Sequence, residues 1–346
     1  MQLNNNQDPF KKEVFLYEQL SQLKVQCKTC QRLCIIAEGK MGYCRTKKNE
    51  QGVLYTINYG MVSSFSINPI EKKPLFHYYP GSLAATIGSF SCNFSCPWCQ
   101  NWEISKISPS EVLKPNFLPP EEIINRIKKD NRISGVSISF NEPTLSLEYA
   151  IDVFKLLNES YYKMFVTNGY MTSETLAQLI DVGLTGMSIT VKGNNSSVEK
   201  YCQANGELVW GTIEEAFRKG IHLEIICLII PSVNDTVAFY EEVAERILGI
   251  NPKIPLHFTQ FFPYYHFLNH PPTPVSTLEN AHQIVLEKGL AYVYLGNVFG
   301  HPFENTYCNH CKKLLIKRTG YKTDFFLDLE TKLCPTCGEK ILLITK

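Results

Sequence analysis

The chain has 346 residues, of which 44% are hydrophobic, and this composition is typical of a globular protein with a full α/β core. Its formal net charge of +1 argues against the broad basic surface of a nucleic-acid-binding protein. No apolar run approaches the roughly 20 residues that span a bilayer, and residues 1–15 lack the apolar segment of a secretory signal. We therefore expect a cytoplasmic protein without a membrane segment.

The distribution of the cysteines is more informative than their number. Of the 13 cysteines, 11 fall in three short groups. Disulfides are rare in a reducing compartment, so cysteines clustered in this way usually bind metal. The groups are Cys27, Cys30, Cys34 and Cys44; Cys92, Cys96 and Cys99; and Cys308, Cys311, Cys334 and Cys337.

Residues 1–82 form a predicted N-terminal segment that carries the first cysteine group. The pattern predicts a short helix over Phe15–Leu23 and β-rich runs at Val53–Tyr59 and Val62–Ile67. The four cysteines from Cys27 to Cys44 offer four soft ligands, which suit a structural site or an electron relay. A zinc ion and a second iron–sulfur cluster both fit, with zinc slightly favoured.

Residues 83–300 alternate apolar, β-rich runs with helical patterns. Six such strands, with helical patterns between them, predict a parallel sheet with outer helices, which we interpret as a partial (β/α)6 barrel of the TIM type; a flat, doubly wound sheet is the alternative. In either fold, functional groups gather where the strands end. The predicted strands are Leu83–Phe90, Val136–Phe140, Met164–Thr167, Thr185–Val191, His222–Ile230 and Pro255–Phe261. The predicted helices are one that begins at Pro120, then Leu147–Leu157, Ser173–Asp181, Thr236–Leu248 and Leu278–Lys288.

The central group, Cys92, Cys96 and Cys99, has the spacing Cys-x3-Cys-x2-Cys and follows the first of these strands. Three thiolates can bind three irons of a 4Fe-4S cluster and leave the fourth iron open, unlike the four cysteines of most electron-transfer clusters. The amine and carboxylate of S-adenosylmethionine (SAM) suit this open position. An electron from the cluster would then break a C–S bond and release a 5′-deoxyadenosyl radical. A zinc site or buried free thiols are the alternatives.

This spacing resembles the signature of the radical SAM superfamily, in which an aromatic residue near the adenine precedes the third cysteine, as Trp98 does. The sequence FNEPT at Phe140–Thr144 resembles the Gly-Gly-Glu-Pro element of the superfamily, which contacts the SAM amino group. The resemblance implies that Glu142 pairs with this ammonium, while Asn141 replaces a glycine. Taken alone, Asn-Glu-Pro is equally typical of a turn before a helix.

Other polar residues lie at predicted strand ends. Thr167 and Asn168 can hydrogen-bond SAM or substrate, or can simply form a turn. Thr190-Val191-Lys192 resembles the Asp-Leu-Lys of pyruvate formate-lyase activating enzymes, which implies a contact between Lys192 and the SAM carboxylate; a solvated lysine is the alternative. His257 is a candidate for contact with ribose or substrate, with aromatic packing as its alternative.

Residues 301–346 form a predicted separate tail. The spacing of Cys308, Cys311, Cys334 and Cys337, two Cys-x2-Cys pairs separated by a β-rich insert, resembles a zinc ribbon. We expect this tail to stabilise or dock rather than to catalyse.

Residues 27–340 together resemble one subgroup, the AmmeMemoRadiSam-system radical SAM enzymes. The matching elements are CxxCxxxC with GxxGYC, NPIEKKPLFHYYPGS, CNFSCPWCQNWEIS, FNEP, FFPYY and YLGNVFG with NTYCNHC. The resemblance implies a 4Fe-4S cluster, SAM and an association with Memo-like proteins, but no substrate. Within PIEKKPLFH, the residues Glu71, Lys72, Lys73 and His77 are either substrate or docking groups or part of a surface loop.

These observations favour a radical SAM enzyme that abstracts hydrogen from an unidentified protein or small molecule and receives electrons from a protein such as a flavodoxin or ferredoxin. A glycyl-radical-enzyme activase is one candidate within this class. The alternative from another class is a non-catalytic zinc-binding interaction module, which leaves the pairing of the central triplet with Asn-Glu-Pro unexplained.

Overall fold

The computed structural model describes residues 8–345. The chain divides into two compact units, which we describe separately. The first unit contains the described residues up to Ile67 together with Ala84–Ser95 and Cys99–Thr185. The second contains Asn68–Leu83, Cys96–Trp98 and the chain from Gly186 onward.

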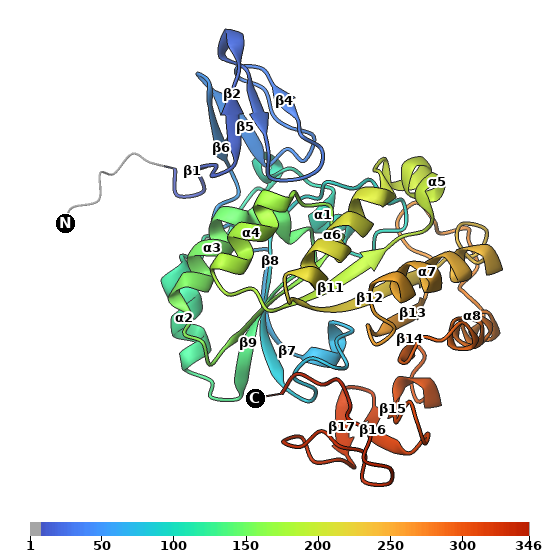
Figure 1. Ribbon diagram of the computed structural model, residues 1–346. Helices are drawn as coiled ribbons and strands as arrows, with labels where there is room; N and C mark the ends of the chain where they lie inside the picture. Colours follow the sequence, from blue (N-terminus) through green and yellow to red (C-terminus); the bar gives the residue numbers. More distant parts are fainter. Residues whose placement is uncertain (1–7, 346) are drawn as a thin grey trace. The chain divides into compact units, whose positions relative to one another are not determined.

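Two small three-stranded antiparallel sheets form the N-terminal part of the first unit (Figure 1). Their strand orders are β1-β6-β5 and β2-β3-β4. Apolar side chains from both sheets form a common core that includes Cys27. The bounds are β1 Lys12–Glu13, β2 Tyr17–Gln19, β3 Val25–Cys27, β4 Ile35–Ile36, β5 Lys47–Glu50 and β6 Val53–Thr56.

The predicted helix over Phe15–Leu23 is wrong. Tyr17–Gln19 pairs with β3 as strand β2, and Ser21–Leu23 is a single 3-10 turn in which Gln22 has a φ of 60°. An isolated helix of this length is marginal even with good propensity. Pairing with β3 satisfies the same backbone groups within a sheet that buries the apolar core.

The α/β part of the first unit contains neighbouring strands β8, β9 and β10, of which β9 and β10 are parallel (Figure 1). Every residue of β9 is buried, which is typical of a parallel strand covered on both faces. As predicted, α2 begins at Pro120 and buries Ile123, Ile124 and Ile127. The bounds are β7 Ser64–Pro69, β8 Leu83–Gly88, α1 Trp102–Ser105, α2 Pro120–Lys128, β9 Ile133–Ile138, α3 Leu147–Leu156, β10 Tyr162–Thr167 and α4 Ser173–Asp181.

The second unit contains four successive strands, each parallel to the next. Helix α6 and strand β14 were not among the predicted elements. Helix α6 buries Val209, Trp210, Ile213 and Ala216 on one face, a spacing that the sequence does contain. The bounds are β11 Gly186–Val191, α5 Asn195–Ser197, a π-helical turn at Val198–Cys202, α6 Gly206–Arg218, β12 His222–Ile229, α7 Val237–Ile250, β13 Leu256–Gln260, α8 Val275–Glu287 and β14 Val293–Gly296.

The tail of the chain is a small antiparallel sheet, as the β-rich insert predicts (Figure 1). Its apolar side chains form one core cluster with Phe76 and with Tyr292 and Tyr294 near and on β14. The bounds are β15 Thr306–Tyr307, β16 Leu314–Thr319 and β17 Lys322–Phe325. Single 3-10 turns occur at Ile70–Lys72, Pro109–Glu111, Pro143–Ser146 and Pro302–Glu304.

Parallel strands joined by helices confirm the predicted α/β class with a parallel sheet. None of the helices within residues 8–345 has the length and apolar character that crossing a membrane requires.

Candidate active site

The loop that carries Cys92 follows β8 and is held by one asparagine. The Oδ1 of Asn141 accepts a hydrogen bond from the backbone N–H of Ser89 at 2.9 Å, and its Nδ2 donates to the backbone oxygens of Phe90 and Ser91, each at 3.1 Å. Both polar ends of this amide therefore fix the backbone immediately before Cys92. The predicted role of Asn141 toward SAM stays a prediction that rests on its position in the motif.

Glu142 joins the segments that follow β9 and β10. Its Oε1 accepts hydrogen bonds from the backbone N–H of Thr144 at 3.1 Å and from the hydroxyls of Thr144 and Thr167, each at 2.6 Å, and its Oε2 accepts from the backbone N–H of Asn168 at 2.8 Å. Oε1 thus accepts three hydrogen bonds and Oε2 only one, so Oε2 keeps a lone pair that these bonds do not use. Burial raises the pKa of Glu142, and the hydrogen bonds oppose this rise.

Asn168 connects this network to Cys92. Its Nδ2 donates to Oδ1 of Asn93 at 2.8 Å and lies 3.9 Å from Sγ of Cys92, while the backbone N–H of Phe94 lies 3.4 Å from the same sulfur. N–H groups directed at a cysteine sulfur stabilise the thiolate and tune an iron–sulfur cluster. The first unit therefore brings Cys92 together with the predicted residues at the ends of β9 and β10.

Two non-glycine residues of this region have positive φ angles. Phe140 has a φ of 75° and Ser91 a φ of 70°. Such strain costs energy and persists where the surrounding contacts impose it. Here the backbone oxygen of Phe140 accepts a hydrogen bond from Nδ2 of Asn101 at 2.7 Å. Phe140 stands where the Gly-Gly-Glu-Pro element that this motif resembles has its first glycine, the residue that adopts a positive φ most readily.

Cys99 lies beside the short helix α1. Its Sγ is 3.0 Å from Oγ of Ser105, and the backbone oxygen of Ile104 accepts a hydrogen bond from the N–H of Ser91 at 2.8 Å. This helix thus contacts both the third cysteine and the loop that carries the first.

Cys96 and Trp98 belong to the second unit, where they pack on the π-helical turn. Sγ of Cys96 lies 3.3 Å from Sγ of Cys202. The Trp98 ring is buried against Tyr201 and Phe267, at centroid distances of 5.6 Å and 5.3 Å. The aromatic residue of the motif is therefore fixed by packing.

The two remaining predicted residues of the second unit have different surroundings. The backbone oxygen of Lys192 accepts a hydrogen bond from Nδ2 of Asn234 at 3.4 Å. His257 is buried, and its Nε2 lies 2.7 Å from Oε2 of Glu224. Burial raises the pKa of Glu224, but hydrogen bonds to His222 and His257 outweigh this effect and hold it below its ordinary value. His257 thus belongs to a buried carboxylate–imidazole cluster, and its contact with SAM or substrate stays a prediction.

The PIEKKPLFH segment is largely buried, so the surface-loop alternative does not hold for Lys73 and His77. The Nδ1 of His77 lies 2.6 Å from the backbone oxygen of Leu342, and its Nε2 lies 2.6 Å from the Tyr294 hydroxyl. Because a carbonyl can only accept, Nδ1 carries the proton and Nε2 accepts from Tyr294. His77 is thus a structural residue.

Glu71 and Lys72 of the same segment line a polar cavity of the second unit, together with His257, Asn297 and Tyr321. The Oε2 of Glu71 is buried and has no hydrogen-bond partner among residues 8–345. Glu71 and Lys72 therefore remain candidates for substrate or docking groups.

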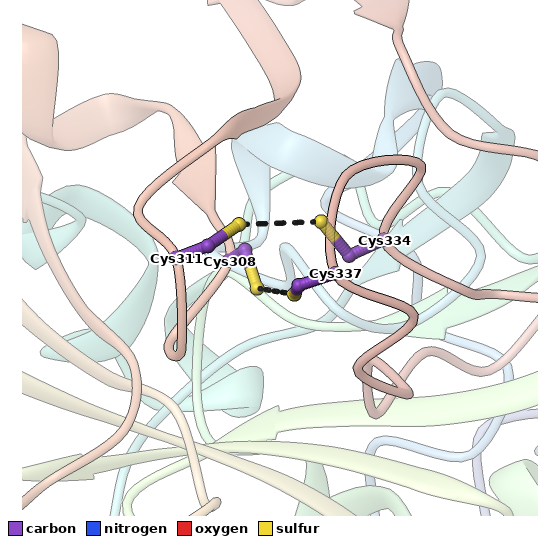
Figure 2. Close-up of side chains that lie close together, drawn as sticks. All are labelled: Cys308, Cys311, Cys334 and Cys337. Atoms are coloured by element: carbon purple, nitrogen blue, oxygen red, sulfur yellow. Dashed lines mark hydrogen bonds between the residues drawn. The ribbon is translucent and has the colours of Figure 1, made fainter.

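The C-terminal thiols form a compact tetrad. Figure 2 shows Cys308 and Cys311 on one loop facing Cys334 and Cys337 on another, with Sγ–Sγ distances of 3.6 Å for Cys308–Cys337 and 3.5 Å for Cys311–Cys334. All four sulfurs lie within 4.8 Å of one another. Tetrahedral zinc with Zn–S bonds of about 2.3 Å places its sulfurs roughly 3.8 Å apart, so the geometry fits zinc.

The first cysteine group lines a single small pocket of the first unit, which also contains Arg32 and Lys47. Sequence reasoning placed these cysteines together but missed Arg32, which lies between Cys30 and Cys34. It also missed Asn93 beside Cys92, and Cys202 beside Cys96. The motif itself contained Asn93, whereas only the fold brings Cys202 to the second cysteine.

The chain is similar to several known proteins. The sequence profile of the radical SAM superfamily matches residues 86–243. The uncharacterized protein MJ0808 of Methanocaldococcus jannaschii is 41% identical over 338 residues, which cover 96% of this chain and 99% of that protein. The putative glycyl-radical enzyme activating enzyme MJ1632 of the same organism is 24% identical over 221 residues, 62% of this chain and 78% of that protein. A solved domain of a pyruvate-formate lyase-activating enzyme from Bacteroides vulgatus aligns with a TM-score of 0.41 and 20% identity over 47% of this chain and 99% of that one.

The chain belongs to the radical SAM superfamily and is a radical SAM enzyme. Membership implies a 4Fe-4S cluster and SAM. The surroundings of Cys92 fit such a group, because the sulfur is approached by a backbone and an amide N–H. Membership also argues against the alternative of a non-catalytic zinc-binding module.

Proposed function

We propose that Cys92, Cys96 and Cys99 bind the 4Fe-4S cluster and that the enzyme uses SAM to abstract hydrogen from a protein or small-molecule substrate. The carrying observation is the continuous set of hydrogen bonds that runs from Glu142 through Asn168 to the surroundings of the Cys92 sulfur. A cluster bound there with SAM supplies the electron that cleaves SAM to the 5′-deoxyadenosyl radical.

The side chains of the network have separate tasks in this proposal. Glu142 holds the backbone of Asn168, which in turn directs its amide toward Cys92. A SAM ammonium that binds Glu142 would pair with Oε2, which accepts only the backbone N–H of Asn168. Trp98, which is held by packing, would lie near the adenine.

Asn141, Lys192 and His257 complete the proposed set of SAM or substrate contacts. Asn141 positions the loop that carries Cys92, and Lys192 would meet the SAM carboxylate. A role of His257 in substrate contact is supported by its position in the wall of the polar cavity that Glu71 and Lys72 also line. We therefore propose this cavity as a candidate substrate site.

The rest of the architecture supports a radical SAM core with two additions. We propose a partial (β/α)6 barrel over residues 83–300, an N-terminal four-cysteine segment over residues 1–82, and a zinc ribbon over residues 301–346. Zinc in the ribbon is supported by the short sulfur–sulfur distances of its tetrad. The clustered cysteines, which suit a reducing compartment, support a cytoplasmic location.

The substrate class stays open between a protein and a metabolite. Similarity to the putative activating enzyme MJ1632 favours a glycyl-radical-enzyme activase as the second candidate. A flavodoxin- or ferredoxin-like reductant and a Memo-like partner belong to the proposal through the family resemblance alone. Incubation with candidate glycyl-radical enzymes would test the activase, since activation yields a glycyl radical visible by EPR.

The central test uses anaerobically reduced protein with SAM. We expect a cluster EPR signal that SAM alters, and slow release of 5′-deoxyadenosine. Cys92→Ala should abolish both, whereas Cys227→Ala, which removes a buried thiol outside the three groups, should keep both. Normal SAM cleavage by the Cys92→Ala variant would contradict the proposed site.

A further inference from the structure

The proposed radical SAM chemistry gives no role to the first four cysteines, which line one small pocket of the first unit. Cys27, Cys30 and Cys44 are buried, and Cys34 is half-buried, on the wall of one pocket. Among its lining residues there is no carboxylate or imidazole. A set of four sulfur ligands with no further donor fits a closed site for a thiophilic metal, either zinc or iron–sulfur, rather than a catalytic site with an open position.

A second observation at this pocket concerns Asn93, the residue after Cys92. Its side chain is fully buried, and its Nδ2 has no hydrogen-bond partner among the described residues. The same side chain lies close to Cys30. Metal-bound cysteines commonly accept hydrogen bonds from neighbouring N–H groups, and an unpartnered amide N–H beside Cys30 can supply such a bond.

Arg32 fixes the backbone of the same asparagine. Its Nε and Nη2 donate to the backbone oxygen of Asn93 at 3.0 Å and 2.8 Å. The guanidinium also stacks on Tyr43, at 3.9 Å from the ring centroid. Because Arg32 lies between Cys30 and Cys34, its position depends on how these cysteines are held.

Two further hydrogen bonds hold both ends of the Cys92 loop to the cysteine segment. The hydroxyl of Ser91 donates to the backbone oxygen of Cys44, and the hydroxyls of Tyr43 and Ser95 bind each other. The segment thus contacts the loop before, after and next to Cys92.

The cysteine segment also holds the loop that follows β10. The hydroxyls of Thr172 and Thr175 donate to the backbone oxygens of Lys28 and Thr29, each at 2.7 Å. This loop begins with Asn168, whose amide contacts Asn93. One small segment therefore contacts both loops from which the proposed cluster and SAM contacts arise.

We propose that Cys27, Cys30, Cys34 and Cys44 form a closed metal centre that holds the Cys92 loop, through Asn93 and Arg32, in the shape that retains the catalytic cluster. The metal centre stands on its own residues, whereas its effect on the catalytic cluster rests on the proposed function above.

The metal centre is tested in the background Cys92→Ala/Cys96→Ala/Cys99→Ala, which removes the catalytic cluster. Zinc and iron per chain are measured by mass spectrometry after anaerobic purification. Adding Cys30→Ser and Cys44→Ser should remove one zinc, or about four irons. Adding Cys227→Ser instead should remove nothing. Metal content that is unchanged by Cys30→Ser and Cys44→Ser would overturn the proposal.

The effect on the loop is tested with Arg32→Met, which keeps all four thiols. We expect retained metal at the first cysteine group and a SAM-sensitive EPR signal that decays roughly tenfold faster under a chelator, since hydrogen bonds from a charged donor are lost. Arg126→Met is the matched control, because Arg126 is an exposed arginine of the same unit that pairs only with Glu122 among the ion pairs of the described residues. Equal decay in the two variants would overturn the proposal.

The two proposals fail in different ways. If the unmodified protein shows no SAM-sensitive signal, the proposed function is wrong. The metal content of the triple variant still tests whether the first cysteine group binds metal. If the signal is present and Arg32→Met leaves its decay unchanged, the proposed function stands and the coupling fails.

Discussion

Each of the two four-cysteine segments contains an arginine that stacks on an aromatic ring and holds a neighbouring backbone, but the backbone that is held differs. In the first unit, Arg32 stacks on an aromatic ring and donates to the backbone oxygen of Asn93. In the second unit, Arg318 stacks on Phe76 at 3.9 Å and donates to the backbone oxygen of Phe76 at 2.9 Å. An arginine suits both places because its planar guanidinium can stack and hydrogen-bond at the same time.

The difference lies in what each arginine holds. Asn93 is next to Cys92, so the first group acts on the loop of a proposed cluster ligand. Phe76 precedes His77, whose backbone N–H and ring contact Glu224, Tyr294 and Leu342 of the tail. Loss of the first cysteine group should therefore disturb the catalytic cluster, while loss of the second should disturb stability.

The largest expected effect is on the second group. Cys334→Ser should release zinc and unfold the tail, because structural zinc contributes on the order of 10 kcal/mol or more to small domains. Limited proteolysis should then cut within residues 301–346, and the zinc content should fall by one per chain. The SAM-sensitive EPR signal should persist.

A protease-resistant tail in the Cys334→Ser variant would contradict the zinc ribbon. Loss of the EPR signal with a folded first unit would contradict the division of roles between the two cysteine groups. Cys227→Ser again serves as the control for removing a buried thiol.

A buried ion pair beside the first group gives the second prediction. Nζ of Lys47 lies 2.6 Å from Oε2 of Glu148, and both side chains are at most 1% exposed. Lys47→Met would leave the carboxylate without its partner and should lower the free energy of unfolding by about 3–5 kcal/mol. Urea denaturation measures this loss.

The double variant Lys47→Met/Glu148→Leu should be more stable than Lys47→Met alone, since no uncompensated charge remains buried. A fully additive loss in the double variant would show that the pair is not coupled. Either way, metal at the first cysteine group should remain, because neither residue is a thiol ligand.

The sequence predicted the elements whose signal is local. The Cys-x3-Cys-x2-Cys spacing, the tail cysteines and helix α2 all follow from residues near one another, and the α/β class with a tight C-terminal tetrad is confirmed. The predicted helix over Phe15–Leu23 is wrong because Tyr17–Gln19 pairs with β3 as a strand. The use of Arg32 and Asn93 could not be predicted, since it depends on a contact between residues 61 positions apart.

His77 gives a prediction with a defined pH range for the second group. Burial lowers the pKa of His77 from 6.5 to about 4. Between these values the unfolded chain binds a proton that the folded chain does not, so stability falls as the pH is lowered from about 6.5 to 4. The loss from this residue should be on the order of 3 kcal/mol.

Denaturation curves at several pH values measure this slope. His77→Gln removes the titration, so its unfolding free energy should fall less steeply over the same range, whatever its stability at neutral pH. Parallel slopes for the two proteins would contradict a buried neutral His77.

The smallest expected effect comes from Arg318→Lys. Arg318 is buried, and its Nη1 donates to the backbone oxygen of Glu304 at 3.1 Å and to Oγ1 of Thr306 at 2.9 Å, in addition to its bond with Phe76. Lysine keeps the charge but cannot reach these acceptors in the same planar geometry, so we expect a loss of about 1–3 kcal/mol. The exposed Arg218→Lys is the control. Because Arg318 holds a structural segment, the variant should retain the SAM-sensitive signal that Arg32→Met destabilises, and faster decay in Arg318→Lys would remove the distinction between the two cysteine groups.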